Sequence, residues 1–332
     1  MTFFASIGRI MPAPATQRQP APRFGIGEWY GRSFIKLSAI QRRDLAVKAI
    51  NHGSDTTPLC PFKADGGACH KKGGVCSLRL YEAKASLPTG EWSATPVVGQ
   101  EGDLRIVCPT RFQQNEIVFR KVALTVLGTD SAKTVGEVRF LQRVRNEPST
   151  SAAAEQAEEE TAREDVGNID MVLLAPETDP LKWCALEIQA VYFSGERMGL
   201  LFEHLHDFPT DDLPFPDRTR RPDYRSSGPK RLMPQLQIKV PTLRRWGKKM
   251  AVVVDGAFFR NMGRMDTVKD LSNCDIAWFV VQFDEGTDPA TLKIGEPEKQ
   301  TLERAVEGLT GGEPVTLAEF EAKIRAKLGT GE

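Results

Sequence analysis

The sequence of 332 residues predicts an α/β fold. Short apolar runs rich in β-branched and aromatic residues, which are typical of buried or half-buried strands, occur along the same chain as segments whose apolar residues recur at helical spacing. The strand-like runs are Asn168–Leu174, Trp183–Tyr192, Phe119–Val126, Met250–Asp255 and Asp275–Phe283. The helical segments are Ser33–Ala49, 135–141, Pro234–Trp246 and Leu317–Leu328.

Length and composition describe an ordinary globular protein. A chain of 332 residues suggests roughly two domains, and 40% hydrophobic with 27% charged residues is usual for a packed core under a charged surface. No run approaches the ~18 apolar residues that a membrane span needs. The first eleven residues lack the basic start of a signal peptide, so we expect a cytoplasmic protein whose six cysteines are thiols or metal ligands.

The formal net charge of zero hides a strong segregation of charge. Residues 218–249 contain eleven Lys or Arg and one acid, whereas residues 155–165 contain six acids and one Arg. A basic block in a neutral protein indicates a local surface for a polyanion. Guanidinium groups fit phosphates and guanine edges bidentately, so the predicted DNA contacts are Arg220, Arg221, Arg225, Arg244 and Arg245.

Four of the six cysteines lie in one segment rich in glycine and proline. Cys60, Cys69, Cys76 and Cys108 are separated by eight, six and thirty-one residues, a spacing that does not match paired C-x-x-C knuckles. Thiolates in a tetrahedral cage suit zinc or iron, and the residues do not distinguish these metals. The alternative is four unrelated buried thiols, as we expect for Cys184 and Cys274.

Two strand-like runs each carry an acid among apolar residues. Asp170 precedes Glu187 by seventeen positions, and a turn with two prolines separates their strands. Strand alternation puts Glu187 and Gln189 on one face, with Leu186 and Ile188 on the other. Two such acids repel each other unless a divalent cation lies between them. The alternative is that Asp170 caps a turn and Glu187 pairs with an arginine.

Several motifs in the same order resemble the NotI-like type II restriction endonucleases. They span residues 30 to 190 approximately: Glu28-Trp29-Tyr30-Gly31, Cys60-Pro61-Phe62, Gly73-Gly74-Val75-Cys76, Cys108-Pro109-Thr110-Arg111-Phe112, Asn168-Ile169-Asp170 and Leu186-Glu187-Ile188-Gln189. The last two are similar to the active-site motif of PD-(D/E)xK nucleases in its Gln variant. The combination of four cysteines before Asp…Glu-x-Gln makes the resemblance specific.

The resemblance implies a restriction-endonuclease-like mixed central sheet flanked by helices, with an N-terminal four-cysteine domain that holds iron. It implies a homodimer that hydrolyses double-stranded DNA at specific sequences. The expected domains are an arm with a basic helix (1–50), the four-cysteine metal-binding segment (51–115) and the nuclease domain (116–332).

The resemblance also implies roles for residues of the nuclease motif. Asp170, Glu187 and the Ile188 carbonyl are expected to hold Mg²⁺, and Gln189 is expected to orient the attacking water. Glu137 is the candidate for a further acid from a helix before the first strand, in competition with Glu147 and the acids at 155–164.

Two other functions fit the same residues. A repair or mobile-element nuclease would share the core, and a non-catalytic DNA-binding protein would use the cysteines and the basic tract without the paired acids.

Overall fold

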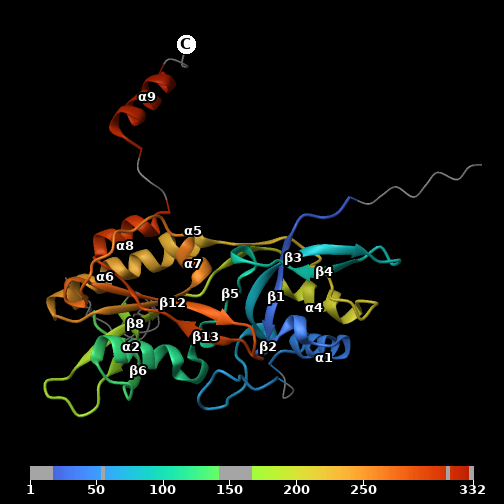
Figure 1. Ribbon diagram of the computed structural model, residues 1–332, viewed down its shortest axis with the longest axis horizontal. Helices are drawn as coiled ribbons and strands as arrows, with labels where there is room; N and C mark the ends of the chain where they lie inside the picture. Colours follow the sequence, from blue (N-terminus) through green and yellow to red (C-terminus); the bar gives the residue numbers. More distant parts are fainter. Residues whose placement is uncertain (1–17, 54–56, 142–166, 312–314, 329–332) are drawn as a thin grey trace, which may run out of the picture.

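The computed structural model describes residues 18–53, 57–141, 167–311 and 315–328, which are organised around a five-stranded and a seven-stranded sheet (Figure 1). The acids at 155–165, Glu147 and residues 1–17 lie outside the described residues. The strands are β1 (Arg23–Trp29), β2 (Arg32–Ser33), β3 (Val75–Ser86), β4 (Trp92–Pro96), β5 (Arg105–Ile106), β6 (Lys133–Arg139), β7 (Asn168–Leu174), β8 (Trp183–Ile188), β9 (Phe193–Gly195), β10 (Arg220–Pro222), β11 (Met250–Asp255), β12 (Ile276–Asp284), β13 (Thr291–Ile294) and β14 (Glu298–Gln300).

Helices connect and cover these strands. They are α1 (Ala39–Ile50), α2 (Ile117–Leu127), α4 (Met198–Asp207), α5 (Tyr224–Ser227), α6 (Met233–Arg245), α7 (Gly256–Arg260), α8 (Leu302–Leu309) and α9 (Leu317–Leu328). Shorter helical turns are η1 (Phe34–Lys36), η2 (Lys72–Gly74), η3 (Gln100–Gly102), η4 (Pro109–Glu116), η6 (Gly228–Leu232) and η7 (Leu271–Asn273). Within the described part of the chain, none of the helices has the length and apolar character needed to cross a bilayer.

The five-stranded sheet is antiparallel and has the order β2-β1-β3-β4, with β5 also paired to β3. Its core receives Trp29 and Leu78 from the sheet, Leu45 from α1, and Phe202 and Leu205 from α4. Helix α4 follows the nuclease motif in sequence but packs in this N-terminal core. Strands from the predicted ranges 1–50 and 51–115 therefore form one sheet, and a helix from the predicted range 116–332 packs in the core of that sheet.

The seven-stranded sheet is mixed and has the order β13-β12-β11-β8-β7-β6, with β14 also paired to β12. Strands β8, β11 and β12 are parallel, whereas β7 and β6 are antiparallel to their neighbours. Helix α2 packs on one face, and helices α6 and α8 pack on the other. This arrangement confirms the predicted mixed sheet flanked by helices, and the strands expected at 168–174, 183–192, 250–255 and 275–283 correspond to β7, β8, β11 and β12.

Alternating side chains keep the two faces of the larger sheet distinct. Ala251 and Val253 of β11 pack towards α2, whereas Val252 and Val254 pack towards α6. Strand β11 is buried along its whole length, as the apolar run at 250–255 predicts for a central strand.

Two elements differ in type from the prediction. The segment Phe119–Val126, expected as a strand, belongs to helix α2, which buries Val118, Val122 and Ala123 at helical spacing. The segment 135–141, expected as helical, contains most of the edge strand β6, which pairs with β7. In both cases a short apolar run fits either period, and the neighbouring sheet decides between them.

The helix predicted at Ser33–Ala49 begins six residues later, at Ala39. Ser38 and Gln41 form a reciprocal capping box, which fixes this start because each side chain satisfies the other residue's backbone N–H. The predicted helices at 234–246 and 317–328 are confirmed as α6 and α9.

Candidate active site

The two predicted acids lie side by side on neighbouring strands. Met171 of β7 pairs with Leu186 of β8 in an antiparallel register, which places Asp170 opposite Glu187. Leu186 packs towards α2, so the alternation sends Glu187 to the α6 face, as the sequence predicts. The Glu187 side chain is 3% exposed and that of Asp170 is 45% exposed. One carboxylate is therefore buried beneath a second that reaches solvent.

A lysine that the sequence analysis did not single out completes this pair. Lys239 of α6 is fully buried, and its Nζ lies 2.7 Å from Glu187 Oε2 and 3.5 Å from Asp170 Oδ1. The same ammonium donates to Gln235 Oε1 at 2.7 Å. The alternative partner proposed for Glu187 was an arginine, and the observed partner is this lysine.

The signal for Lys239 is present in the helix pattern. Leu236, Val240 and Leu243 form the buried stripe of α6, and Lys239 lies on this stripe at the i+3 position from Leu236. A lysine on an apolar stripe is rarely fully buried unless it is paired. It therefore indicates a buried acid opposite the helix.

Burial dominates the electrostatics of Glu187. Desolvation raises the pKa of Glu187 to about 8, and the adjacent Asp170 carboxylate acts in the same direction. Lys239 opposes both effects through its charge and its hydrogen bond. Additional positive charge beside the two carboxylates would favour the ionised form of Glu187.

Gln189 follows β8 at the edge of this site. Its backbone N–H donates to the Val253 carbonyl at 3.0 Å, which extends the pairing with β11. Its side-chain Nε2 donates to the Ala190 carbonyl at 2.6 Å. The amide is thus held against its own chain beside the carboxylates.

A cleft of about 750 Å³ opens over the site. Asp170, Ile188, Gln189 and Gln235 line it from the seven-stranded sheet and α6. Its other walls carry five basic residues, which come from the cysteine segment, from β10 and from the turn before α6: Lys71, Lys72, Arg220, Lys230 and Arg231. The acidic pair therefore lies beside a basic cleft large enough to admit a nucleic-acid backbone.

The predicted DNA-contacting arginines do not form one surface. Arg220 lines the cleft but is only 3% exposed, and Arg221 and Arg225 are exposed on β10 and α5. Arg244 lies near the other end of α6, about 14 Å along the helix axis from Gln235. There it donates to Asp275 Oδ1 at 2.9 Å and Oδ2 at 2.5 Å.

Arg220 has unsatisfied hydrogen-bonding capacity next to the cleft. Its Nη2 donates to the Arg197 carbonyl at 3.3 Å, and its Nη1 lies 3.8 Å from Asp217 Oδ1. Its Nε and Nη1 have no hydrogen-bond partner within the described residues. A buried donor in this state is costly, so a ligand that accepts from it gains affinity.

Glu137 lies on an edge strand instead of the expected helix. It belongs to β6, is exposed, and has a φ of 48°. Its neighbours Gly136 and Val138 pair with Met171 and Ile169, so Glu137 stands opposite Asp170 in the register of β6 and β7.

The four cysteines of the N-terminal segment are buried free thiols in one neighbourhood. The bridge between Leu59 and Ala68 brings Cys60 and Cys69 together, and the backbone N–H of Cys108 donates to the Cys76 carbonyl. Burial raises the pKa of Cys69, and Cys60 and Cys108 add to this effect. Among the described residues no group of three or more His, Cys, Asp or Glu side chains is arranged to hold a metal ion. The four thiols are of the ligand type that zinc and iron take, but their side chains do not form such a cage here.

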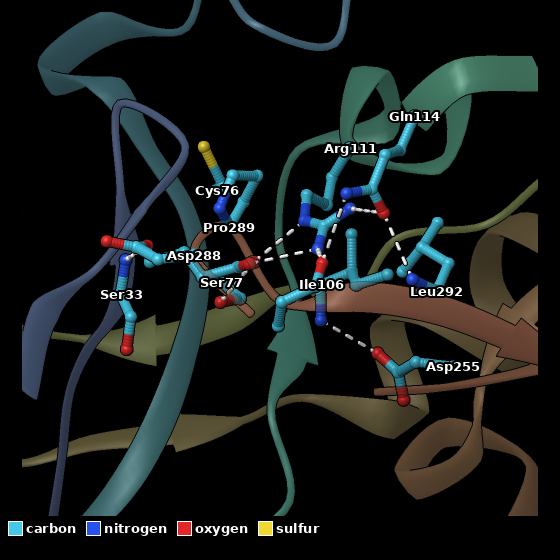
Figure 2. A network of polar contacts seen from close by, with 12 residues as sticks. Ser33, Cys76, Ser77, Ile106, Arg111, Gln114, Asp255, Asp288, Pro289 and Leu292 are labelled. Atoms are coloured by element: carbon cyan, nitrogen blue, oxygen red, sulfur yellow. Dashed lines mark hydrogen bonds and ion pairs between the residues drawn. The ribbon is translucent and has the colours of Figure 1, made fainter. Parts of the chain in front are cut away.

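A buried polar network joins the two sheets next to the cysteines (Figure 2). Arg111 donates to both carboxylate oxygens of Glu28, at 2.8 and 2.9 Å, and to the Ala290 carbonyl. Asp255, at the end of β11, accepts from the Ile106 N–H of β5 at 2.8 Å. Strands of one sheet are thereby tied to loops and strand ends of the other.

A mixed sheet with two adjacent carboxylates beside a basic cleft is the arrangement of a phosphodiester-cleaving nuclease. The family model described as restriction endonuclease NotI matches residues 45–294, and the chain belongs to this family. It is accordingly a type II site-specific deoxyribonuclease. The membership disfavours both alternatives, a repair nuclease and a non-catalytic DNA-binding protein. No curated protein matches the chain.

Proposed function

We propose that the chain hydrolyses double-stranded DNA in a Mg²⁺-dependent reaction at the cleft beside Asp170 and Glu187. The main support is that the two carboxylates are adjacent across β7 and β8, while Asp170 and Gln189 line the basic cleft. Carboxylate and carbonyl oxygens are the ligands that Mg²⁺ prefers, so Asp170, Glu187 and the Ile188 carbonyl would hold it. When bound, the ion would lower the pKa of a water and offset charge on the leaving oxygen.

The residues of the chain supply binding and orientation. Lys71, Lys72, Lys230 and Arg231 would bind backbone phosphates along the cleft, since each lines it. Gln189 has no titrating proton near neutral pH, so its amide can orient the attacking water but cannot act as general base. A role for Glu137 stays a prediction, and it would act from an exposed position on the edge strand β6, opposite Asp170 in the register.

Cleavage of plasmid DNA under fixed Mg²⁺, paired with gel-shift affinity, tests this proposal. Asp170→Asn and Glu187→Gln should abolish cleavage and retain DNA binding, whereas Gln189→Ala should be less damaging because it removes no metal ligand. Replacing Mg²⁺ by Ca²⁺ should permit binding without cutting. Glu203→Gln, an exposed acid on α4, is the matched control and should cut normally. If Glu187→Gln cuts at the wild-type rate, the nuclease site lies elsewhere.

We further propose that Cys60, Cys69, Cys76 and Cys108 bind one structural iron or zinc. The support is chemical: the four thiols are buried and come from three backbone segments, burial raises the pKa of Cys69 and Cys76, and metal binding would favour thiolate forms. The resemblance favours iron over zinc.

A homodimer is proposed for the active form, in the cytoplasm. The described residues of one chain provide one such acidic pair at the cleft, and cutting both strands of a duplex requires two. Light scattering of the protein with and without duplex DNA tests the dimer, and a chain that is monomeric in both conditions would contradict it.

A further inference from the structure

Lys239 is the cation of the acidic pair. The salt bridges of Glu187 and Asp170 within the described residues are both to its Nζ, at 2.7 and 3.5 Å. Gln189 has a neutral side chain and brings no charge to the site. Among the described residues, the positive charge in direct contact with the two carboxylates therefore comes from α6, fifty-two positions along the chain from Glu187.

The position of Lys239 does not allow it to act directly on a substrate. Its side chain is fully buried, whereas Gln235, which accepts from the same ammonium, lines the cleft. A buried ammonium needs compensating acceptors, and its three contacts supply them. Its influence must then pass through Glu187 and Asp170.

We propose that Lys239 is a positioning residue that acts as a resident counter-ion. It holds the two carboxylates together, and it competes with the divalent cation for them. This inference rests on the proposed function, because it takes Asp170 and Glu187 as the ligands of that cation.

Competition follows from charge and distance. An ammonium within hydrogen-bonding distance of Glu187 Oε2 occupies one of the oxygens that a divalent ion would use. An ion on the remaining oxygens binds against a unit positive charge a few ångströms away, in a partly buried site where screening is weak. The negative phosphate of bound DNA would offset this repulsion. Occupancy of the metal site would therefore be low in the free enzyme and would rise when DNA enters the cleft.

The test is the affinity of the full-length chain for Mn²⁺ without DNA, measured by the loss of the free-ion electron paramagnetic resonance signal. Lys239→Gln removes the charge and should bind Mn²⁺ at least about tenfold more tightly than the wild type, as expected for removing a like charge at this range. Lys239→Arg retains the charge and should bind like the wild type. Lys121→Gln, which removes a half-buried lysine of α2 that pairs with Glu296, is the matched control. The double variant Asp170→Asn/Glu187→Gln gives the background from other sites.

The outcomes separate this inference from the proposed function. A wild type above background with no tightening in Lys239→Gln overturns the counter-ion role alone, and a purely structural lysine would give this result together with a lower melting temperature. If the wild type, Lys239→Gln and the background variant all bind equally, the metal site itself fails.

A second comparison tests the proposal if Lys239→Gln does not fold. Lys239→Met combined with Asp170→Asn removes one charge of each sign and should bind Mn²⁺ more tightly than Asp170→Asn alone. Equal or weaker binding in the double variant would overturn the proposal as well.

Discussion

Arg111 and Glu28 form a bidentate ion pair in which neither side chain is more than 1% exposed. The guanidinium also donates to Gln114 Oε1 and lies 4.4 Å from the centre of the Phe62 ring. This pair links β1 of the N-terminal sheet to η4, and through the Ala290 carbonyl to the loop before β13.

Arg111→Met should destabilise the protein strongly. It leaves the Glu28 carboxylate buried without its cation, a change that typically costs about 3–5 kcal/mol. Urea unfolding followed by fluorescence measures the loss. Arg120→Met is the control, because its pair with Glu116 is mostly exposed and should contribute little. Equal losses in the two variants would contradict the prediction.

DNA affinity should depend on the basic residues of the cleft. Lys230→Ala and Arg231→Ala should weaken binding to a mixed-sequence duplex, and each should reduce the slope of log affinity against log salt by about 1. Fluorescence anisotropy at several salt concentrations gives both quantities.

Arg244→Ala is the matched control for this series. Arg244 is already engaged by Asp275 and Glu303 near the far end of α6, so its loss should lower stability without changing the salt slope. A slope that falls in Arg244→Ala and not in Arg231→Ala would place the DNA on the other end of the helix.

Asp255 should make stability fall as pH rises. Burial raises the pKa of Asp255 to about 6 from 3.8, although it accepts from the backbone of Ile106 and Phe258. An acid whose pKa is higher in the folded than in the unfolded state does not destabilise the fold below the unfolded pKa. The full destabilisation is present once the pH is above the folded pKa of about 6. From pH 5 to pH 7.5 the free energy of unfolding of Asp255→Asn should therefore rise relative to that of the wild type by about 1–2 kcal/mol.

The measurement for Asp255 is urea unfolding of both proteins at the two pH values. The informative quantity is how the difference in free energy of unfolding changes with pH. The difference at a single pH also contains the loss caused by asparagine, which cannot accept both backbone hydrogen bonds. Parallel pH profiles for the two proteins would mean that Asp255 does not titrate in this range.

Metal content should depend on the four clustered cysteines. Cys76→Ser and Cys108→Ser should lose the proposed iron or zinc and melt at a lower temperature, since each removes one of the four proposed ligands. Cys184→Ser is the control, because Cys184 is equally buried but lies in the larger sheet. Elemental analysis of the purified proteins is the measurement. Less than about half an equivalent of iron or zinc per chain in the wild type would contradict the prediction.

The strands that carry the candidate site could be predicted from sequence because their patterns are local. The strands β7, β8, β11 and β12 are apolar runs bounded by turn residues. Strand alternation alone puts Glu187 and Leu186 on opposite faces of the sheet. Helix α2 could not be predicted in the same way, because its β-branched and aromatic residues fit a strand as well as a helix.

Lys239 could not be assigned to the site because its role depends on tertiary contact. The helix pattern puts Lys239 on a buried stripe, but the local sequence does not identify Glu187, fifty-two positions away, as its partner. The separation of Arg220 from Arg244 has the same origin, since one helix carries the basic tract from the cleft to the opposite end.

Helix α4 has a practical consequence for engineering. It is encoded after the nuclease motif, yet Leu201, Phe202 and Leu205 complete the core of the N-terminal sheet. A truncation at residue 116, or an exchange of the first hundred residues with those of a relative, would leave that core open and the helix without its contacts. New cutting specificities in this scaffold are better sought by substitutions along the cleft walls than by recombining its halves.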